Sequence, residues 1–160
     1  MRRNGFLRIA AAAVFCVALG VGPALAAGSS DDDEPAKNPD YTAAVKLIDA
    51  KKYAQAIPLL KKAEAKEPRN ADVQNYLGYT HRKLKKFDEA MKYYKTALSI
   101  KPKHRGANEY IGELYLELNQ LAMAEKHLEV LDDACFFGCE EYTDLKKAIA
   151  AYKARNGKGS

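Results

Sequence analysis

Cys135 and Cys139 are the residues of this chain whose side chains could most readily carry out chemistry together. Three residues separate them, and Gly138 allows a turn that could bring their sulfur atoms within bonding distance. We predict a disulfide between them, because the N-terminal segment described below predicts export, and an exported protein meets an oxidising environment. We also expect Phe136 and Phe137 to pack into the junction that this disulfide closes. Two alternatives remain open. One is a redox-active pair, although C-x₃-C is not the C-x-x-C of thiol oxidoreductases, and the other is a pair of thiolate ligands for copper(I), or for zinc with help from a histidine.

The three histidines, His81, His104 and His127, form no catalytic arrangement in the sequence. They do not have the H-x-x-x-H or H-E-x-x-H spacing of a metal site. The sequence also contains no glycine-rich phosphate loop, no G-x-S-x-G motif and no paired acid and base. We therefore expect a protein that is not an enzyme and that needs no cofactor.

The first 26 residues have the order of a secretory signal peptide. Three arginines lie among the first eight residues, residues 9–21 are an uninterrupted apolar run, and residues 24–26 read Ala-Leu-Ala. An uncleaved membrane anchor is the alternative, since residues 9–27 carry no charge, but two glycines and a proline interrupt the end of that run. We predict cleavage after Ala26, a periplasmic location in a bacterium, and no stable membrane insertion of the mature protein.

Composition and charge exclude several classes of protein. The chain is 48% hydrophobic and 29% charged, which is typical of a globular protein rather than a disordered one. Its formal charge of +5 falls to +2 when the three arginines of the signal peptide, which holds no acid, are removed, so no nucleic-acid partner is expected. Residues 27–38 are small, acidic or proline residues without an apolar period, which predicts a flexible linker.

From residue 39 onward the sequence repeats every 34 residues. The residue types that recur at this offset are Tyr53, Phe87 and Leu121; Ala56, Ala90 and Ala124; Leu60, Tyr94 and Leu128; Ala63 and Ala97; Pro68 and Pro102; and Ala44, Gly78 and Gly112. A period in this range is typical of a helical solenoid. Each unit predicts two helices, over residues 40–50 and 54–66, 71–84 and 88–100, and 105–118 and 122–132.

The C-terminal segment departs from the repeat. Its apolar residues Tyr142, Leu145, Ile149 and Tyr152 follow helical spacing, so they predict one amphipathic helix over residues 140–155 that caps the solenoid. Residues 156–160 are expected to be a loose tail.

The repeat pattern resembles the tetratricopeptide repeat (TPR) family. The second repeat carries the resemblance most fully, through Leu77-Gly78, Phe87, Ala90, Tyr94, Ala97 and Pro102, whereas the third lacks its closing proline. The resemblance implies an all-α helix-turn-helix solenoid with three TPR-like repeats, about residues 37–70, 71–104 and 105–138. With the capping helix, this domain covers residues 39–155.

The resemblance also implies a function, because TPR arrays bind peptides or protein segments on a concave face lined by the first helix of each pair. Mapping the period onto this chain predicts a groove with Tyr41, Asn75, Tyr79, Arg82, Glu109, Glu113 and Glu117. Some family members clamp a terminal carboxylate with Lys and Asn, but two of these glutamates stand where basic groups would be needed. The three glutamates are spaced i, i+4, i+8 and therefore share one helical face.

Charge is strongly segregated along the repeats. Bases exceed acids by seven from Arg82 to Arg105, and acids exceed bases by nine from Glu109 to Asp144. These runs are either solvated helix faces or a dipolar surface that steers a charged partner. Our hypothesis is a non-catalytic adaptor or scaffold of the bacterial cell envelope, whose groove holds a partner segment bearing Lys or Arg. The alternative is a thiol-dependent copper carrier or redox helper that uses Cys135 and Cys139, and self-association of stacked repeats is also open.

Overall fold

The computed structural model describes residues 38–156, and within this range the chain forms seven α-helices and no strand. The helices are α1 (Pro39–Asp49), α2 (Tyr53–Lys66), α3 (Ala71–Lys83), α4 (Phe87–Ile100), α5 (Arg105–Glu117), α6 (Leu121–Ala134) and α7 (Glu140–Asn156). All of them belong to one compact unit. The prediction of an all-α helical solenoid is confirmed. The predicted signal peptide, the linker up to residue 37 and the tail from residue 157 lie outside the described residues.

Side-chain caps begin the first helix of each pair. Asn38 accepts hydrogen bonds from the backbone N–H groups of the first turn of α1, Asn70 does the same for α3, and His104 accepts one from Ala107 at the start of α5. These bonds satisfy N–H groups that have no partner inside the helix. The caps therefore fix where each repeat starts.

Tight turns at equivalent positions join the two helices of each pair. Lys51, Lys85 and Asn119, each 34 residues apart, have φ of 57°, 61° and 59°. At the first of these turns, Lys52 N–H donates to Leu47 C=O and Lys51 N–H donates to Ile48 C=O, which is the Schellman pattern of helix ends. The turn returns the chain beside the helix it has just left.

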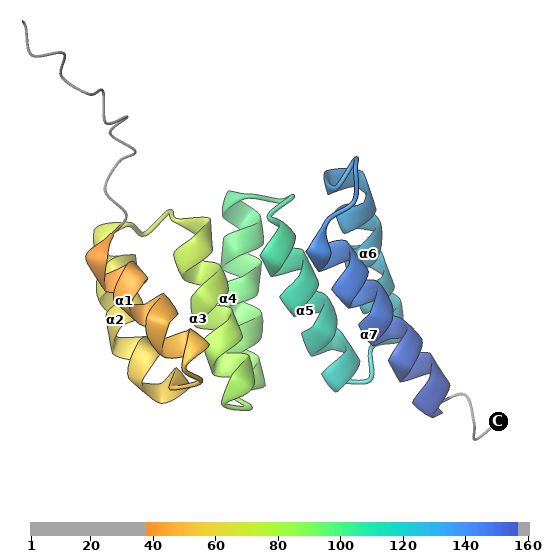
Figure 1. Cartoon of the computed structure of the whole chain (residues 1–160), viewed down its shortest axis with the longest axis horizontal. Helices are drawn as coiled ribbons and strands as arrows, with labels where there is room; N and C mark the ends of the chain where they lie inside the picture. Colours follow the sequence, from red (N-terminus) through yellow and green to blue (C-terminus); the bar gives the residue numbers. More distant parts are fainter. Residues whose placement is uncertain (1–37, 157–160) are drawn as a thin grey trace, which may run out of the picture. The chain divides into compact units, whose positions relative to one another are not determined.

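Two series of helices result from this connectivity. Within residues 38–156, the backbones of α1, α3, α5 and α7 each lie close to the next member of their series, whereas those of α2, α4 and α6 lie farther from one another. Lys61 of α2 reaches the ring of Tyr93 of α4 only through its long side chain. Figure 1 shows the helices following one another in chain order, from α1 at one end to α7 at the other. We call the surface formed by α1, α3, α5 and α7 the inner face, since a layer whose helices touch lies on the concave side of a solenoid.

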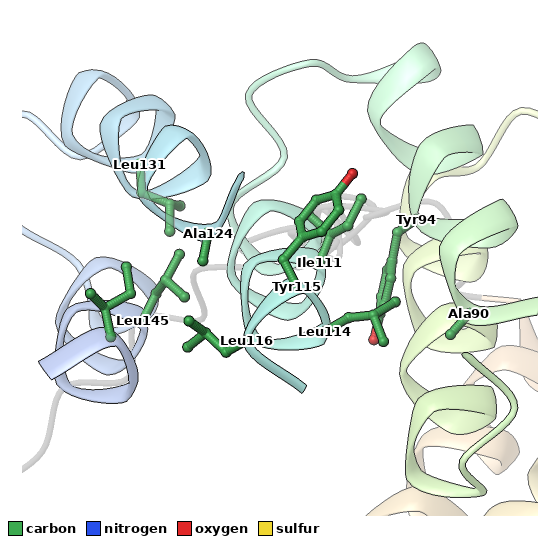
Figure 2. Close-up of a cluster of buried hydrophobic side chains, with 10 residues drawn as sticks. Ala90, Tyr94, Ile111, Leu114, Tyr115, Leu116, Ala124, Leu131 and Leu145 are labelled. Carbon is green, nitrogen blue, oxygen red and sulfur yellow. The ribbon is translucent and has the colours of Figure 1, made fainter. Parts of the chain in front are cut away.

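The residues that recur every 34 positions fill the core. Ala56, Ala90 and Ala124 are fully buried, as are Leu60 and Tyr94. Figure 2 shows how α5 divides the larger cluster of buried side chains. Its Leu114 lies toward Tyr94 of α4, and its Leu116 lies toward Leu145 of α7.

Two of the recurring small residues, Gly78 and Gly112, allow a neighbouring helix to approach closely, and the neighbouring helix differs between them. A Cβ added at Gly78 would lie 2.5 Å from Tyr94 Cδ1, in the second helix of the same repeat. A Cβ added at Gly112 would lie 2.6 Å from Leu145 Cδ2, in α7. The close partner of Gly112 is therefore the capping helix, which packs where the first helix of a further repeat would lie.

The prediction that Phe136 and Phe137 pack into the junction of α6 and α7 is wrong. Their side chains are 91% and 97% exposed and contact each other edge to face, with ring centroids 5.3 Å apart. The junction is already filled by Leu131, Leu145 and Ile149, so neither ring has space inside it.

Replacing Gly78 with alanine should destabilise the protein, although alanine is the better helix former. The added methyl group would meet the buried ring of Tyr94, which cannot move aside, and overpacking of this kind costs about 1–3 kcal/mol. The matched variant Gly112→Ala should cost less, because the methyl ends of Leu145 can rotate. Urea unfolding measures both free energies, and a Gly78→Ala protein as stable as the wild type would contradict the packing argument.

Candidate functional site

Four tyrosines line the inner face, and we call them the tyrosine face: Tyr41 of α1, Tyr76 and Tyr79 of α3, and Tyr110 of α5. Tyr41 and Tyr76 have ring centroids 5.7 Å apart, and Tyr79 and Tyr110 have centroids 4.8 Å apart. All four side chains are half-buried, so each ring packs on one side and remains accessible on the other. Sequence reasoning missed Tyr76 and Tyr110, although they are separated by one 34-residue period.

Burial keeps the hydroxyl groups of these tyrosines protonated. It raises the pKa of Tyr79 to about 12, with a smaller contribution from the hydroxyl of Tyr53, and it also raises the pKa values of Tyr41, Tyr76 and Tyr110. The tyrosine face therefore offers neutral hydroxyl groups that can donate or accept hydrogen bonds, beside apolar ring surface.

Arg82 lies at the centre of the inner face and is almost completely buried. Its guanidinium group pairs with Glu113 through Nη2 and with Glu117 through Nη1, the second contact measuring 3.0 Å. The guanidinium carbon also lies 5.9 Å from the ring centroid of Tyr79 and 5.8 Å from that of Tyr110. This one side chain thus connects α3 to α5 and packs against two rings of the tyrosine face.

These ion pairs change the expected character of the groove. Glu117 also accepts a 2.7 Å contact from Lys85, so two of the three glutamates predicted to bind a basic partner are already paired within the protein. A pocket of about 240 Å³ lies beside them. Its lining residues are Arg82 of α3, Glu113, Leu116 and Glu117 of α5, and Ala148, Ala151 and Arg155 of α7. The capping helix therefore borders the site, which the sequence did not indicate.

Glu109 differs from the other two glutamates. Its side chain is only 8% exposed, and no hydrogen bond or ion pair joins it to another of the described residues. Burial raises the pKa of Glu109 to about 8, and the neighbouring carboxylates of Glu113, Asp144 and Glu141 act in the same direction. This carboxyl group is therefore held in a place where its charge is unfavourable.

The remaining predicted groove residue, Asn75, does not reach the surface. It is 4% exposed, and a Cβ added at Gly106 of α5 would lie 3.1 Å from its Nδ2 atom. Its Oδ1 atom has no hydrogen-bond partner among the described residues. The structure therefore brings Tyr79, Arg82, Glu113 and Glu117 together on the inner face, and it places Asn75 in the seam between α3 and α5.

The histidines have structural contacts. His104 Nδ1 accepts from the backbone of α5, so its Nε2–H donates to Asp72 at 2.9 Å, and this bond lowers the pKa of the aspartate. Asn108 uses its amide N–H groups on the carbonyl oxygens of Pro102 and His104, and its Oδ1 accepts from His127 Nδ1 at 2.9 Å. His81 stacks on Tyr93 with centroids 5.3 Å apart. Each histidine thus joins neighbouring helices.

The structure joins Cys135 and Cys139 in a disulfide that closes the loop between α6 and α7, with Cα atoms 5.6 Å apart. Nowhere in residues 38–156 do three His, Cys, Asp or Glu side chains come close enough together to hold a metal ion.

The second repeat of this chain matches a known family model. Residues 71–104, which include α3 and α4, match the family model described as tetratricopeptide repeat. This segment is a TPR. Gly78, Ala90, Tyr94 and Ala97, whose spacing suggested the family, form the packed centre of this TPR.

Solved structures with the same fold include two kinds of TPR protein. The first TPR of Spaghetti (RPAP3), bound to an HSP90 peptide, is 22% identical, with a TM-score of 0.62, over 70% of this chain and 89% of that chain. The type III secretion translocator chaperone SycD of Yersinia enterocolitica is 18% identical, with a TM-score of 0.66, over 76% and 92%. The same chaperone in complex with a peptide of the translocator YopD gives a TM-score of 0.62 at 18% identity, over the same shares of the two chains. At these identities the likeness establishes the fold. A comparison with functionally curated proteins found no match.

Replacing Arg82 with methionine should remove a large part of the stability of the inner face. Glu113 and Glu117 would lose their buried partner, and leaving charges unpaired in this way costs about 3 kcal/mol. Lys85→Met is the matched control, because this exposed lysine pairs with the same Glu117 and should contribute less than about 1 kcal/mol.

The triple variant Arg82→Met, Glu113→Gln, Glu117→Gln should recover most of the loss, since the two carboxylates are removed together with the guanidinium group and the lysine that loses its partner, Lys85, is exposed. Thermal and urea unfolding measure these differences. Equal costs for Arg82→Met and Lys85→Met would show that the buried pairs are not the centre of the inner face.

Proposed function

We propose that this protein is a non-catalytic adaptor that binds an extended segment of a partner protein on the tyrosine face. The tyrosine face itself carries the proposal, because four half-buried tyrosines on the inner layer present apolar surface and hydroxyl groups that are already fixed in position. Tyrosine binds partner segments well, since its ring contributes contact area at a small cost in side-chain entropy.

Proteins with the same fold support the proposal of peptide binding. The Spaghetti (RPAP3) and SycD structures each hold a peptide, one from HSP90 and one from the translocator YopD. The HSP90 peptide, SRMEEVD, is acidic at its end, whereas Arg82 in this chain is already neutralised by Glu113 and Glu117. We therefore infer that the partner is not recognised through a terminal carboxylate but through an extended segment lying across the ring faces.

The proposed place of action is the periplasm of a bacterium, because residues 1–26 have the order of a cleaved secretory signal. Among the residues that the structure describes, no helix has the length and apolar character needed to cross a bilayer. An oxidising compartment also suits the disulfide between Cys135 and Cys139, which would hold the start of α7 against the end of α6.

Removing a ring from the tyrosine face should weaken peptide binding. Peptides selected on the wild-type protein from a random 12-residue phage library provide the probe, and calorimetry measures their affinity. Tyr79→Ala should lower that affinity by about tenfold or more, the effect expected of a central aromatic contact. Phe137→Ala removes an equally large ring that is 97% exposed and lies in the α6–α7 loop, so it should leave the affinity unchanged.

Two results would contradict the adaptor. One is a library that yields no specific peptide, and the other is a set of peptides whose affinity is the same for Tyr79→Ala and the wild type.

Export and the redox state of the cysteines can be measured together. The native protein, taken from the envelope fraction and alkylated without reductant, should have an intact mass that begins at Ala27 and carries no alkyl group. A cleaved chain with two alkyl groups would instead favour the thiol-dependent carrier. Cys135→Ser with Cys139→Ser should retain peptide binding and lose about 2 kcal/mol of stability, the loop-closure contribution expected for a five-residue loop.

A further inference from the structure

A small pocket lies between α5 and the start of α7, apart from the Arg82 ion pairs. Its volume is about 220 Å³, and its lining residues are Glu109, Tyr110, Glu140, Glu141 and Asp144. We call it the acid pocket. Four of these five residues carry a carboxyl group and none is basic, so the pocket has a concentrated negative potential.

Glu109 forms the inner wall of the acid pocket and has no partner in the described part of the chain. Its side chain is more than nine-tenths buried, and the cation that acts on it from α3, Arg82, is already paired with Glu113 and Glu117. A buried carboxylate without a counter-charge is costly, so a ligand that supplies the counter-charge gains this energy on binding.

The spacing of the carboxylates favours an organic cation over a metal ion. Within residues 38–156 no three acidic or other metal-binding side chains are close enough to share one ion, and these four carboxylates are included in that range. An arginine guanidinium is wider than an ion and has five N–H donors, so it can reach several separated carboxylates at once. A planar guanidinium also stacks on a tyrosine ring, and Tyr110 lies in the wall of the acid pocket.

We propose that the acid pocket binds the guanidinium group of one arginine side chain of the partner segment. This inference rests on the proposed function, since Tyr110 belongs to both the acid pocket and the tyrosine face and would bring the segment past the pocket entrance. The Lys or Arg that the sequence analysis expects in the partner segment is thereby assigned a place. It lies against Glu109 and α7, not against Glu113 and Glu117.

Binding at the acid pocket should depend on pH. The groups that face Glu109 are Glu113 on its own helix, Asp144 and Glu141 on α7, and Arg82 on α3. Burial and the three carboxylates raise the pKa of Glu109 to about 8, against the opposing effect of the Arg82 charge. Below that pH Glu109 of the empty pocket is protonated, and its proton must be released to the solvent when the arginine pairs with it. The affinity for arginine should therefore rise between pH 6 and pH 8.

The test uses two small probes, Nα-acetyl-arginine amide and Nα-acetyl-citrulline amide, which have nearly the same shape but differ in charge. NMR titration of the protein at pH 8 should show the arginine probe binding about tenfold more tightly than the citrulline probe, with shifts in the amide signals of α5 and α7. Glu109→Gln should remove this preference, and so should Asp144→Asn. Glu129→Gln, which removes an exposed carboxylate of α6, should leave the preference unchanged.

The Glu109→Gln protein is expected to fold. Folded Glu109 binds its proton more tightly than the unfolded chain does, so its ionisation between about pH 4 and pH 8 destabilises the native state. The variant should therefore have a higher melting temperature than the wild type, by an amount that grows as the pH rises through this range.

Three results would overturn the proposal that the acid pocket binds arginine. They are equal binding of the two probes, no binding of either probe, and a preference for the arginine probe that survives Glu109→Gln. If the acid pocket fails this test but the library peptides still require Tyr79, the adaptor function stands without the acid pocket. If peptide binding does not require Tyr79 either, the adaptor function is contradicted as well.

Discussion

The fold depends on the close approach of helices at small residues that recur every 34 positions. Ala56, Ala90 and Ala124 are fully buried, and at Gly78 the ring of Tyr94 occupies the space that a side chain would need. The contact at Gly78 fixes how α3 packs on α4, and the equivalent contact at Gly112 is made with α7. The tight turns and capped helix starts repeat the helix pair along the chain. The inner face, with its ordered row of tyrosines, follows from that repetition.

A second constraint acts on the inner face itself. Stacked repeats alone leave α3 and α5 with little contact, and Arg82 bridges them by pairing with Glu113 and Glu117 while packing under two tyrosine rings. The same bridge neutralises the charge at the centre of the face. In the proposed adaptor, recognition there would consequently depend on ring surface and hydroxyl groups, and charge would act at the edge where α7 begins.

The 34-residue period predicted the helices and the polar character of the inner face, because the period follows directly from the geometry of a helix pair. It could not predict which charges pair, since Arg82 and Glu113 belong to different repeats and only the packing of α3 on α5 brings them together. Asn75 was placed correctly on α3 but wrongly at the surface, because the approach of Gly106 covers it. Phe136 and Phe137 were misjudged from hydrophobicity alone, since the neighbouring junction was already full.

The capping helix has two surfaces with different tasks. Lys146, Lys147 and Lys153 lie on its exposed side, where a terminal helix of a solenoid needs charge. Glu140 and Glu141 occupy its first turn, where the helix dipole stabilises carboxylates even without a cation. Glu109 receives no such stabilisation because it lies one turn inside α5 and is buried. Of the carboxylates in the acid pocket, Glu109 is thus the one whose charge depends most on a partner, so a bound guanidinium should be felt most strongly at this residue.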